Sequence, residues 1–303
     1  MTTTPPLGEF QEIDGRRLFV HRSGHGGPAV VFLPGASAVG LDYFGVHQEV
    51  ARFTTAVLYD RGGTGYSDAL PLPRGATAVA TELRELLLAQ GVAAPYVLAA
   101  HSLGGLYAHR FAQLYPREVA GLVFLDALHP RWDDFMPPAA SLAEAERPGP
   151  EPDRQALRAM HAELRAGYPD DVGLPLIEAK VSDEWLRAGA AERTGLVALA
   201  DELRGGPDLP DVPAIALTVV GTDAGHPSQE INEAKTKMDA ERMSGFSRGE
   251  QRVIFDTLHH RLCFDRPDAV VQAIRDVVAW WAGGSYGQED GCSRSAGSRR
   301  PPG

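Results

Sequence analysis

Short apolar runs that alternate with helical patterns constrain the fold of this chain more than any other feature of its sequence. Strand-like runs lie at residues 16–22, 29–35, 54–60, 95–101, 121–126, 214–221 and 251–256. From the third onwards they are continuously apolar, as expected for parallel strands covered on both faces. Helical patterns lie between or after them, at 75–90, 103–115, 228–243 and 267–282. This alternation predicts an α/β fold with a mostly parallel, doubly wound sheet, whose ligands bind at the carboxyl ends of the strands.

One long interval interrupts the alternation. Between residues 129 and 210 no convincing strand occurs, and helical stretches at 152–167 and 183–204 are separated by joints rich in proline and glycine. An interval of this length is too long for a structureless loop inside a domain. The sequence therefore predicts a helical cap inserted after the strand at 121–126.

The predicted domain organisation is a core, a cap and a tail. The core consists of residues 1–128 and 211–282, the cap of residues 129–210, and the tail of residues 283–303. A hydrophobic fraction of 44% in 303 residues allows a large buried core. The tail is rich in glycine, serine and arginine and has almost no apolar residues. It cannot bury enough apolar surface to fold, so we expect it to be disordered.

The charge balance and the cysteines exclude several classes of partner and cofactor. With 29 Lys and Arg against 40 Asp and Glu, the formal net charge is −11, which opposes binding to nucleic acid. The two cysteines, Cys263 and Cys292, are too few for a disulfide framework or a four-cysteine zinc site, and they suit a reducing compartment. The N-terminus shows no secretory pattern, and no apolar run approaches the ~20 residues that span a bilayer. We therefore expect a cytoplasmic protein without a membrane partner.

Ser102 lies at a turn between a predicted strand and a predicted helix. The segment PYVLAAHSLGG runs from an apolar strand through this serine into the helix at 103–115. Ala100 and Gly104 lie two residues before and two after it, and a sharp turn needs small residues there because the backbones approach closely. The pattern favours a nucleophilic serine over a helix N-cap serine. His101 is expected to be structural, because adjacent residues on a turn project in different directions.

The stretch Ala100–Gly104 resembles the G-x-S-x-G nucleophile elbow of the α/β-hydrolase fold superfamily, with alanine in the first position. The segment YDRGGTGYSD at 59–68 is similar to an architectural motif of that family, to which we assign no chemistry. The resemblance extends from residue 9 to residue 282. It implies an α/β-hydrolase fold with a serine as the nucleophile. It also implies a helical cap after the sixth strand of that fold, which corresponds here to the strand at 121–126.

The resemblance also implies an oxyanion hole built from two backbone N–H groups. One belongs to Leu103, and the other to Ala36 in the loop LPGASAVG. Relatives usually carry His-Gly at the start of this loop, where the present chain has Pro34-Gly35. Because the donor is a main-chain group, losing the histidine need not remove the hole. It leaves open what braces the loop.

The family places the catalytic histidine after the last strand and the acid between the serine and that histidine. In IFDTLHHRLCFDRPD, counting five residues back from Asp265 gives His260 as the base. For the acid we favour Asp126, which ends the sixth strand in the context LDALHP. The alternative is Asp223 in VVGTDAG, one residue short of the more widespread acid position. The expected catalytic set is Ser102, His260 and one of these two aspartates.

A complete Ser/Asp/His set predicts a serine hydrolase that cleaves a carboxylic ester or lactone through an acyl-enzyme on Ser102, with no metal or other cofactor. One alternative is a thioesterase, which would need a partner such as an acyl carrier protein. Another is a lyase or cyclase that uses the triad for proton transfer. A non-catalytic small-molecule binder is disfavoured, because a binder has no need of all three residues. A serine at the elbow also disfavours a dehalogenase or an epoxide hydrolase, whose nucleophile in this fold is an aspartate.

Large apolar side chains of the predicted cap are candidates for the substrate pocket. They are Trp132, Phe135, Met160 and Trp185. If they face the catalytic cleft, the substrate is apolar, and the negative charge of the chain favours a neutral molecule. Packing of the cap helices onto the core explains the same residues equally well.

Overall fold

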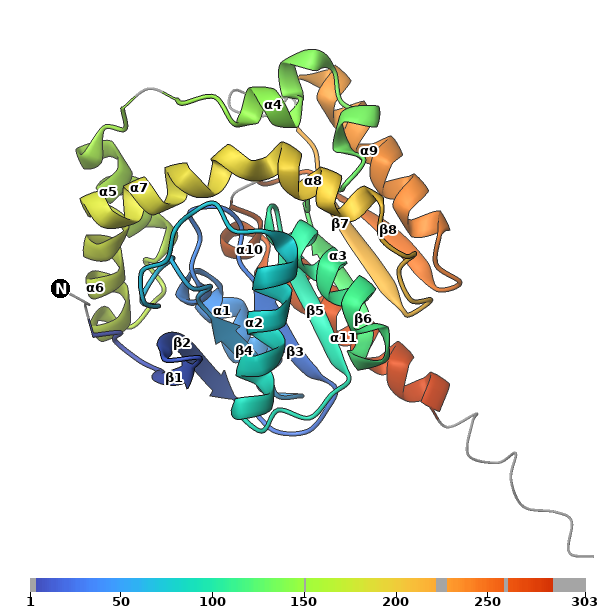
Figure 1. Ribbon diagram of the computed structural model, residues 1–303, viewed down its shortest axis with the longest axis horizontal. Helices are drawn as coiled ribbons and strands as arrows, with labels where there is room; N and C mark the ends of the chain where they lie inside the picture. Colours follow the sequence, from blue (N-terminus) through green and yellow to red (C-terminus); the bar gives the residue numbers. More distant parts are fainter. Residues whose placement is uncertain (1–3, 150, 222–227, 259–260, 286–303) are drawn as a thin grey trace, which may run out of the picture.

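The computed structural model describes residues 4–149, 151–221, 228–258 and 261–285. In these ranges eight strands form one sheet in the order β1-β2-β4-β3-β5-β6-β7-β8 (Figure 1). Their bounds are Glu9–Ile13 (β1), Arg16–Ser23 (β2), Ala29–Leu33 (β3), Ala56–Tyr59 (β4), Tyr96–His101 (β5), Val119–Leu125 (β6), Ala214–Val219 (β7) and Gly249–Ile254 (β8). The pairs β1–β2 and β2–β4 are antiparallel, and the remaining neighbours are parallel. The predicted mostly parallel sheet is confirmed.

Helices cover both faces of the sheet because its central strands are apolar on both sides. Successive side chains of a strand point to opposite faces, and on β3 Val31 and Leu33 pack with helices α2 and α3. Val30 and Phe32, from the other face of the same strand, pack with α1 and α11. Outside the cap the helices are α1 (Phe44–Val50), α2 (Ala76–Ala89), α3 (Gly104–Leu114), α9 (Gln229–Ser244), α10 (Leu262–Asp265) and α11 (Pro267–Ser285), with the short 3₁₀ helices η1 (Gly40–Tyr43) and η2 (Pro116–Glu118).

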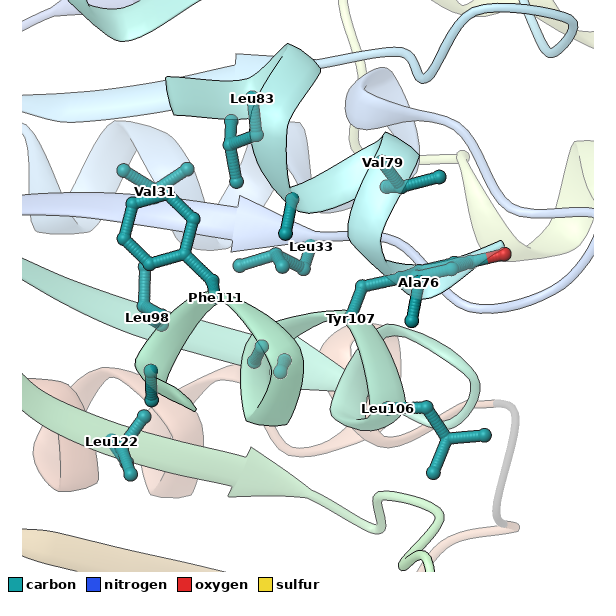
Figure 2. Close-up of a cluster of buried hydrophobic side chains, with 14 of the residues drawn as sticks. Val31, Leu33, Ala76, Val79, Leu83, Leu98, Leu106, Tyr107, Phe111 and Leu122 are labelled. Carbon is teal, nitrogen blue, oxygen red and sulfur yellow. The ribbon is translucent and has the colours of Figure 1, made fainter. Parts of the chain in front are cut away.

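Figure 2 shows the layer between α2, α3 and the sheet. Leu83 of α2 and Phe111 of α3 both reach toward Leu98 and its neighbours on the central strands. These side chains are 0–1% exposed, so each contributes roughly 1.5–3 kcal/mol through burial. The helix that follows Ser102 is therefore held firmly against the sheet.

The interval between β6 and β7 is helical, as predicted, and we call its helices the cap. They are η3 (Trp132–Asp134), η4 (Pro138–Ala140), α4 (Leu142–Ala145), α5 (Arg154–Leu164), α6 (Asp170–Lys180), α7 (Asp183–Glu192), η5 (Arg193–Gly195) and α8 (Leu196–Arg204). Figure 1 shows α7 and α8 in yellow, crossing over the core from α5 and α6 toward α9. The single helix expected over 183–204 is broken into α7 and α8 at Gly195.

Several elements differ from the sequence-based expectation. Strand β1 was not predicted, because its segment EFQEI is mostly polar and only Ile13 is buried. Helix α6 was not predicted either, since it contains Pro175. Helix α11 runs to Ser285, so residues 283–285 belong to this helix and not to the predicted tail. None of the helices in the described ranges combines the length and the apolar character that crossing a membrane requires.

Candidate active site

Two turns with unusual backbone geometry lie at the ends of neighbouring strands. Ser102 follows β5 with φ 50°, and Asp126 follows β6 with φ 45°. A non-glycine residue in this left-handed region costs on the order of 1–3 kcal/mol and persists only where the surroundings enforce it. The Leu128 N–H donates to Ser102 O over 2.9 Å, so a hydrogen bond joins the two turns directly. Such strain is typical of functional sites.

The glycines after Ser102 are required by close packing. A Cβ atom on Gly104 would lie 2.1 Å from Leu33 O, and one on Gly105 would lie 2.7 Å from the Cβ of Ala127. Neither distance is possible for real atoms, so any other residue would push α3 away from β3 and from the β6 turn. The small residues read from the sequence thus have a definite structural cause. They allow the start of α3 to lie against both neighbouring strand ends.

The loop after β3 packs directly against the serine. A Cβ on Gly35 would lie 3.1 Å from the Cβ of Ser102, so the residue directly before Ala36 lies against the half-buried serine. Leu103 is the N-cap of α3, and the first N–H groups of a helix have no intrahelical acceptor. The positive end of the helix dipole adds to their attraction for negative charge. Both predicted oxyanion donors therefore come from segments that border Ser102.

Tyr43 and His101 support this loop through a chain of two hydrogen bonds. The Gly35 N–H donates to the Tyr43 hydroxyl over 3.2 Å, and that hydroxyl lies 2.8 Å from Nδ1 of His101. Burial raises the pKa of Tyr43 well above its ordinary value, so the hydroxyl stays neutral. His101 is 7% exposed. Its ring nitrogen is thus engaged in holding the loop, in keeping with the structural role expected for it.

Arg61, from the segment read as architectural, clamps the same loop. Its Nη1 donates to Pro34 O over 2.6 Å and its Nη2 to Gly35 O over 3.0 Å. It also forms an ion pair with Glu192 of cap helix α7, and both side chains are only 2% exposed. Burial by itself lowers the pKa of Arg61, and the surrounding groups, of which the Glu192 carboxylate has the largest effect, more than reverse it. The guanidinium therefore remains charged in the interior.

Ser37, which follows Ala36 in the loop, is held by hydrogen bonds from the cap. Its N–H donates to Glu192 Oε2 over 2.9 Å, and its carbonyl accepts a hydrogen bond from Lys180 Nζ over 2.7 Å. Its hydroxyl accepts from Arg193 Nη2 over 2.9 Å. Ser37 also has a positive φ, of 61°. Sequence reasoning did not identify these cap residues, since nothing in their local pattern indicates a partner more than 140 residues away.

Asp126 is buried and forms an ion pair with a lysine. Its side chain is 1% exposed and lies 2.7 Å from Nζ of Lys235, which is itself 6% exposed. Oδ1 also accepts the Val219 N–H over 3.0 Å, and Lys235 additionally donates to Val219 O. The lysine, which the sequence did not single out, fixes the orientation of this carboxylate. Asp126 remains a candidate acid because its turn is bonded to that of Ser102.

Two of the predicted catalytic residues, His260 and Asp223, lie outside the described residues, so their placement stays a prediction. Two described residues, one before and one after position 260, are hydrogen-bonded to each other. The Thr257 hydroxyl donates to the Asp265 carboxylate over 3.0 Å, and Thr257 is 5% exposed. Within the described ranges, no three His, Cys, Asp or Glu side chains gather in a way that could hold a metal ion.

The four predicted pocket residues do not line one pocket. Met160 and Trp185 line a cap cavity of about 1090 Å³, which Ser37 and Lys180 border as well. Phe135 lines a different cavity of about 800 Å³. Trp132 packs against the core and donates from its indole nitrogen to Ala140 O over 2.8 Å. The distance between these residues in the folded cap could not be read from their spacing in the sequence.

Comparison with known proteins finds partial sequence relatives and solved structures of the same fold. YbdG of Bacillus subtilis, an uncharacterized protein, is 29% identical over 121 residues, or 39% of this chain and 37% of YbdG. The chain spans less than two fifths of the first curated relatives that it matches. An esterase from Thermogutta terrifontis superposes with a TM-score of 0.60 at 23% identity, over 88% of this chain and 95% of the esterase. Epoxide hydrolase CorEH superposes with a TM-score of 0.63 at 16% identity, over 90% and 98% of the two chains.

The family assignment rests on more than these individual similarities. The family model for the alpha/beta hydrolase family matches residues 30–273, which run from β3 to α11 and include both strained turns. The resemblance inferred from the elbow and from the segment at 59–68 is thereby confirmed. The chain belongs to the alpha/beta hydrolase family.

Proposed function

We propose that this protein is a serine hydrolase that cleaves a carboxylic ester or lactone of a small neutral molecule. The observation that carries the proposal is Ser102 itself, held at φ 50° between β5 and α3 with the loop of Ala36 packed against it. The fold alone does not choose the reaction, because an esterase and an epoxide hydrolase both share it. The nucleophile distinguishes between these reactions, since serine at this turn supports acyl transfer.

In the proposed mechanism Ser102 Oγ attacks the carbonyl carbon while His260 accepts its proton. The N–H groups of Ala36 and Leu103 stabilise the negative oxygen of the tetrahedral intermediate, and each such donor is worth roughly 3–4 kcal/mol. The leaving alcohol takes the proton from His260, and an acyl-enzyme remains. Water then attacks the acyl group with His260 again as the base, which releases the carboxylic acid and restores the serine.

Asp126 is the proposed acid that orients His260, with Asp223 as the alternative. Its turn is bonded to that of Ser102, which supports a role at the site. Its ion pair with Lys235 opposes this role, because a neutralised carboxylate stabilises an imidazolium less well. A thioesterase, or a lyase or cyclase with the same triad, stays open as a second function.

The experiment that tests the proposal is labelling with a fluorophosphonate, read by the mass of the intact protein. Wild type and the control Ser244→Ala, an exposed serine at the end of α9, should each gain one adduct. Ser102→Ala should gain none and lose ester turnover on the order of 10⁶-fold, with its melting temperature nearly unchanged. Full turnover in a folded Ser102→Ala protein would refute the proposal.

The acid is assigned by comparing Asp126→Asn with Asp223→Asn. Loss of the true acid should lower kcat by about 10⁴-fold. Asp126→Asn also leaves Lys235 buried without its partner, so the double variant Asp126→Asn/Lys235→Met is needed to restore stability. If the double variant is stable and fully active, Asp126 is an ion-pair residue only and Asp223 takes its place.

A further inference from the structure

We propose that Arg61 and Glu192 are positioning residues for the oxyanion hole, through which the cap sets the direction of the Ala36 N–H. The inference rests on the proposed function, because that function assigns the N–H its role. It goes further by giving a task to Arg61 and by making the cap a part of the catalytic apparatus.

Arg61 holds the peptide group that joins Gly35 and Ala36. A trans peptide is planar, so its C=O and its N–H point in opposite directions. Arg61 Nη2 donates to the carbonyl oxygen of this group over 3.0 Å. The guanidinium therefore fixes the direction of the Ala36 N–H from the far side. A cation on the carbonyl also polarises the group, which strengthens the N–H as a donor.

The peptide groups on either side of it are held as well. Before it, the Pro34–Gly35 group is held at its carbonyl by Arg61 Nη1 and at its N–H by the Tyr43 hydroxyl. After it, the Ala36–Ser37 group is held at its N–H by Glu192. Among the described residues, the Ala36 N–H between them finds no acceptor. Three successive groups are thus immobilised, and the middle one presents a donor to a ligand.

The restraint on the loop comes from the cap. Ser37 has a left-handed φ of 61°, a conformation that needs support from its surroundings. Glu192, Lys180 and Arg193 supply that support, and all three belong to the cap. Gly189 of α7 allows the approach, because a Cβ there would lie 2.1 Å from Ser37 Oγ. The cap therefore holds the loop in the shape that aims the donor.

The ion pair joins these restraints into one unit. Glu192 Oε1 binds Arg61 and Oε2 binds the Ser37 N–H. A glutamine keeps the shape of the side chain but has one oxygen, so it can satisfy only one of these two donors. Glu192→Gln consequently disturbs the loop without removing any atom that touches substrate.

The test measures kcat, KM and the affinity for an alkyl boronic acid, which forms a tetrahedral adduct on a nucleophilic serine. Removing one oxyanion donor costs about 10²–10³-fold in kcat, and misdirecting it should cost roughly 10- to 100-fold. Glu192→Gln should lower kcat and boronate affinity by the same factor and leave KM within about threefold. The matched control is Glu184→Gln, the same change at an exposed position of the same helix, which should leave all three values unchanged.

A second variant separates positioning from stability. Arg61→Met/Glu192→Met removes both charges together, a change that is often neutral for folding, and yet it removes the hydrogen bonds of Arg61 and Glu192 to the loop. If this folded protein, or folded Glu192→Gln, keeps kcat and boronate affinity within threefold of wild type, the inference is wrong. Ser102→Ala is assayed in parallel. If it retains turnover the proposed function itself fails, whereas an inactive Ser102→Ala beside a fully active Glu192→Gln overturns only the positioning role.

Discussion

Two buried ion clusters join the cap to the core, and they carry their charges in opposite order. In the first, the core supplies the cation Arg61 and the cap supplies the carboxylate Glu192. In the second, the core supplies the carboxylate Asp42, and the cap supplies Arg165 and Lys180. We call them the Glu192 joint and the Asp42 joint. Both tie the cap to the loop that follows β3.

The two joints differ in the backbone groups that they hold. The Glu192 joint holds the peptide groups of residues 34–37, beside Ser102. In the Asp42 joint, Asp42 accepts the Val39 N–H over 3.0 Å, farther along the loop, and Lys180 donates to the Ser37 carbonyl. Buried ion pairs are weak evidence for stability as such, although breaking one is costly. We therefore expect the first joint to govern rate and the second to govern stability.

The largest effect on stability is expected from Asp42→Asn. The change leaves Arg165 and Lys180 buried without a counter-charge, which should lower the free energy of unfolding by about 3–5 kcal/mol. The kcat of the folded enzyme should fall less than in Glu192→Gln. Denaturant unfolding and kcat per titrated active site measure the two quantities. Asp208→Asn, on an exposed loop, is the control, and a larger loss of kcat in Asp42→Asn than in Glu192→Gln would contradict the division.

An intermediate effect is expected from Lys180→Met, because Lys180 contacts both Asp42 and the Ser37 carbonyl. Asp42 keeps Arg165 as its partner, so the free energy of unfolding should fall by only about 1.5–3 kcal/mol, the value of a hydrogen bond to a charged group. The kcat should fall by less than tenfold. Lys237→Met, an exposed lysine of α9, is the matched control. Wild-type stability in Lys180→Met would show that this lysine contributes nothing to the Asp42 joint.

The smallest effect is the pH dependence of the Asp42 joint. Burial by itself would raise the pKa of Asp42, but Lys180 and Arg165 hold it well below its ordinary value of 3.8. Because the pKa is lower in the folded state, the stabilisation is complete above pH 3.8 and is lost as the pH falls below it. The difference in unfolding free energy between wild type and Asp42→Asn should therefore shrink by about 1.4 kcal/mol per pH unit below that value. Urea titrations at pH 3 and pH 6 measure it, and a constant difference would mean that the carboxylate is not held ionised.

Local sequence was sufficient for the elements on which the proposed chemistry depends. The turn at Ser102 could be predicted because its sequence signals are local: an apolar strand before it, a helix after it, and glycines directly after the serine. The cap could be predicted from the length of the interval without strands. Neither inference requires a partner distant in the chain. His260 and Asp223, which were also predicted from local motifs, stay predictions because they lie outside the described residues.

The tertiary structure alone decided how the site is supported. Glu192 meets Arg61 across 131 residues, and Lys235 meets Asp126 across 109. The fold also separates Phe135 and Trp132 from the cavity of Met160 and Trp185. Periodicity and turn chemistry report only neighbours along the chain, within a few residues. A buried charge finds its counter-charge through packing, so the residues that hold this candidate site in shape became visible only in three dimensions.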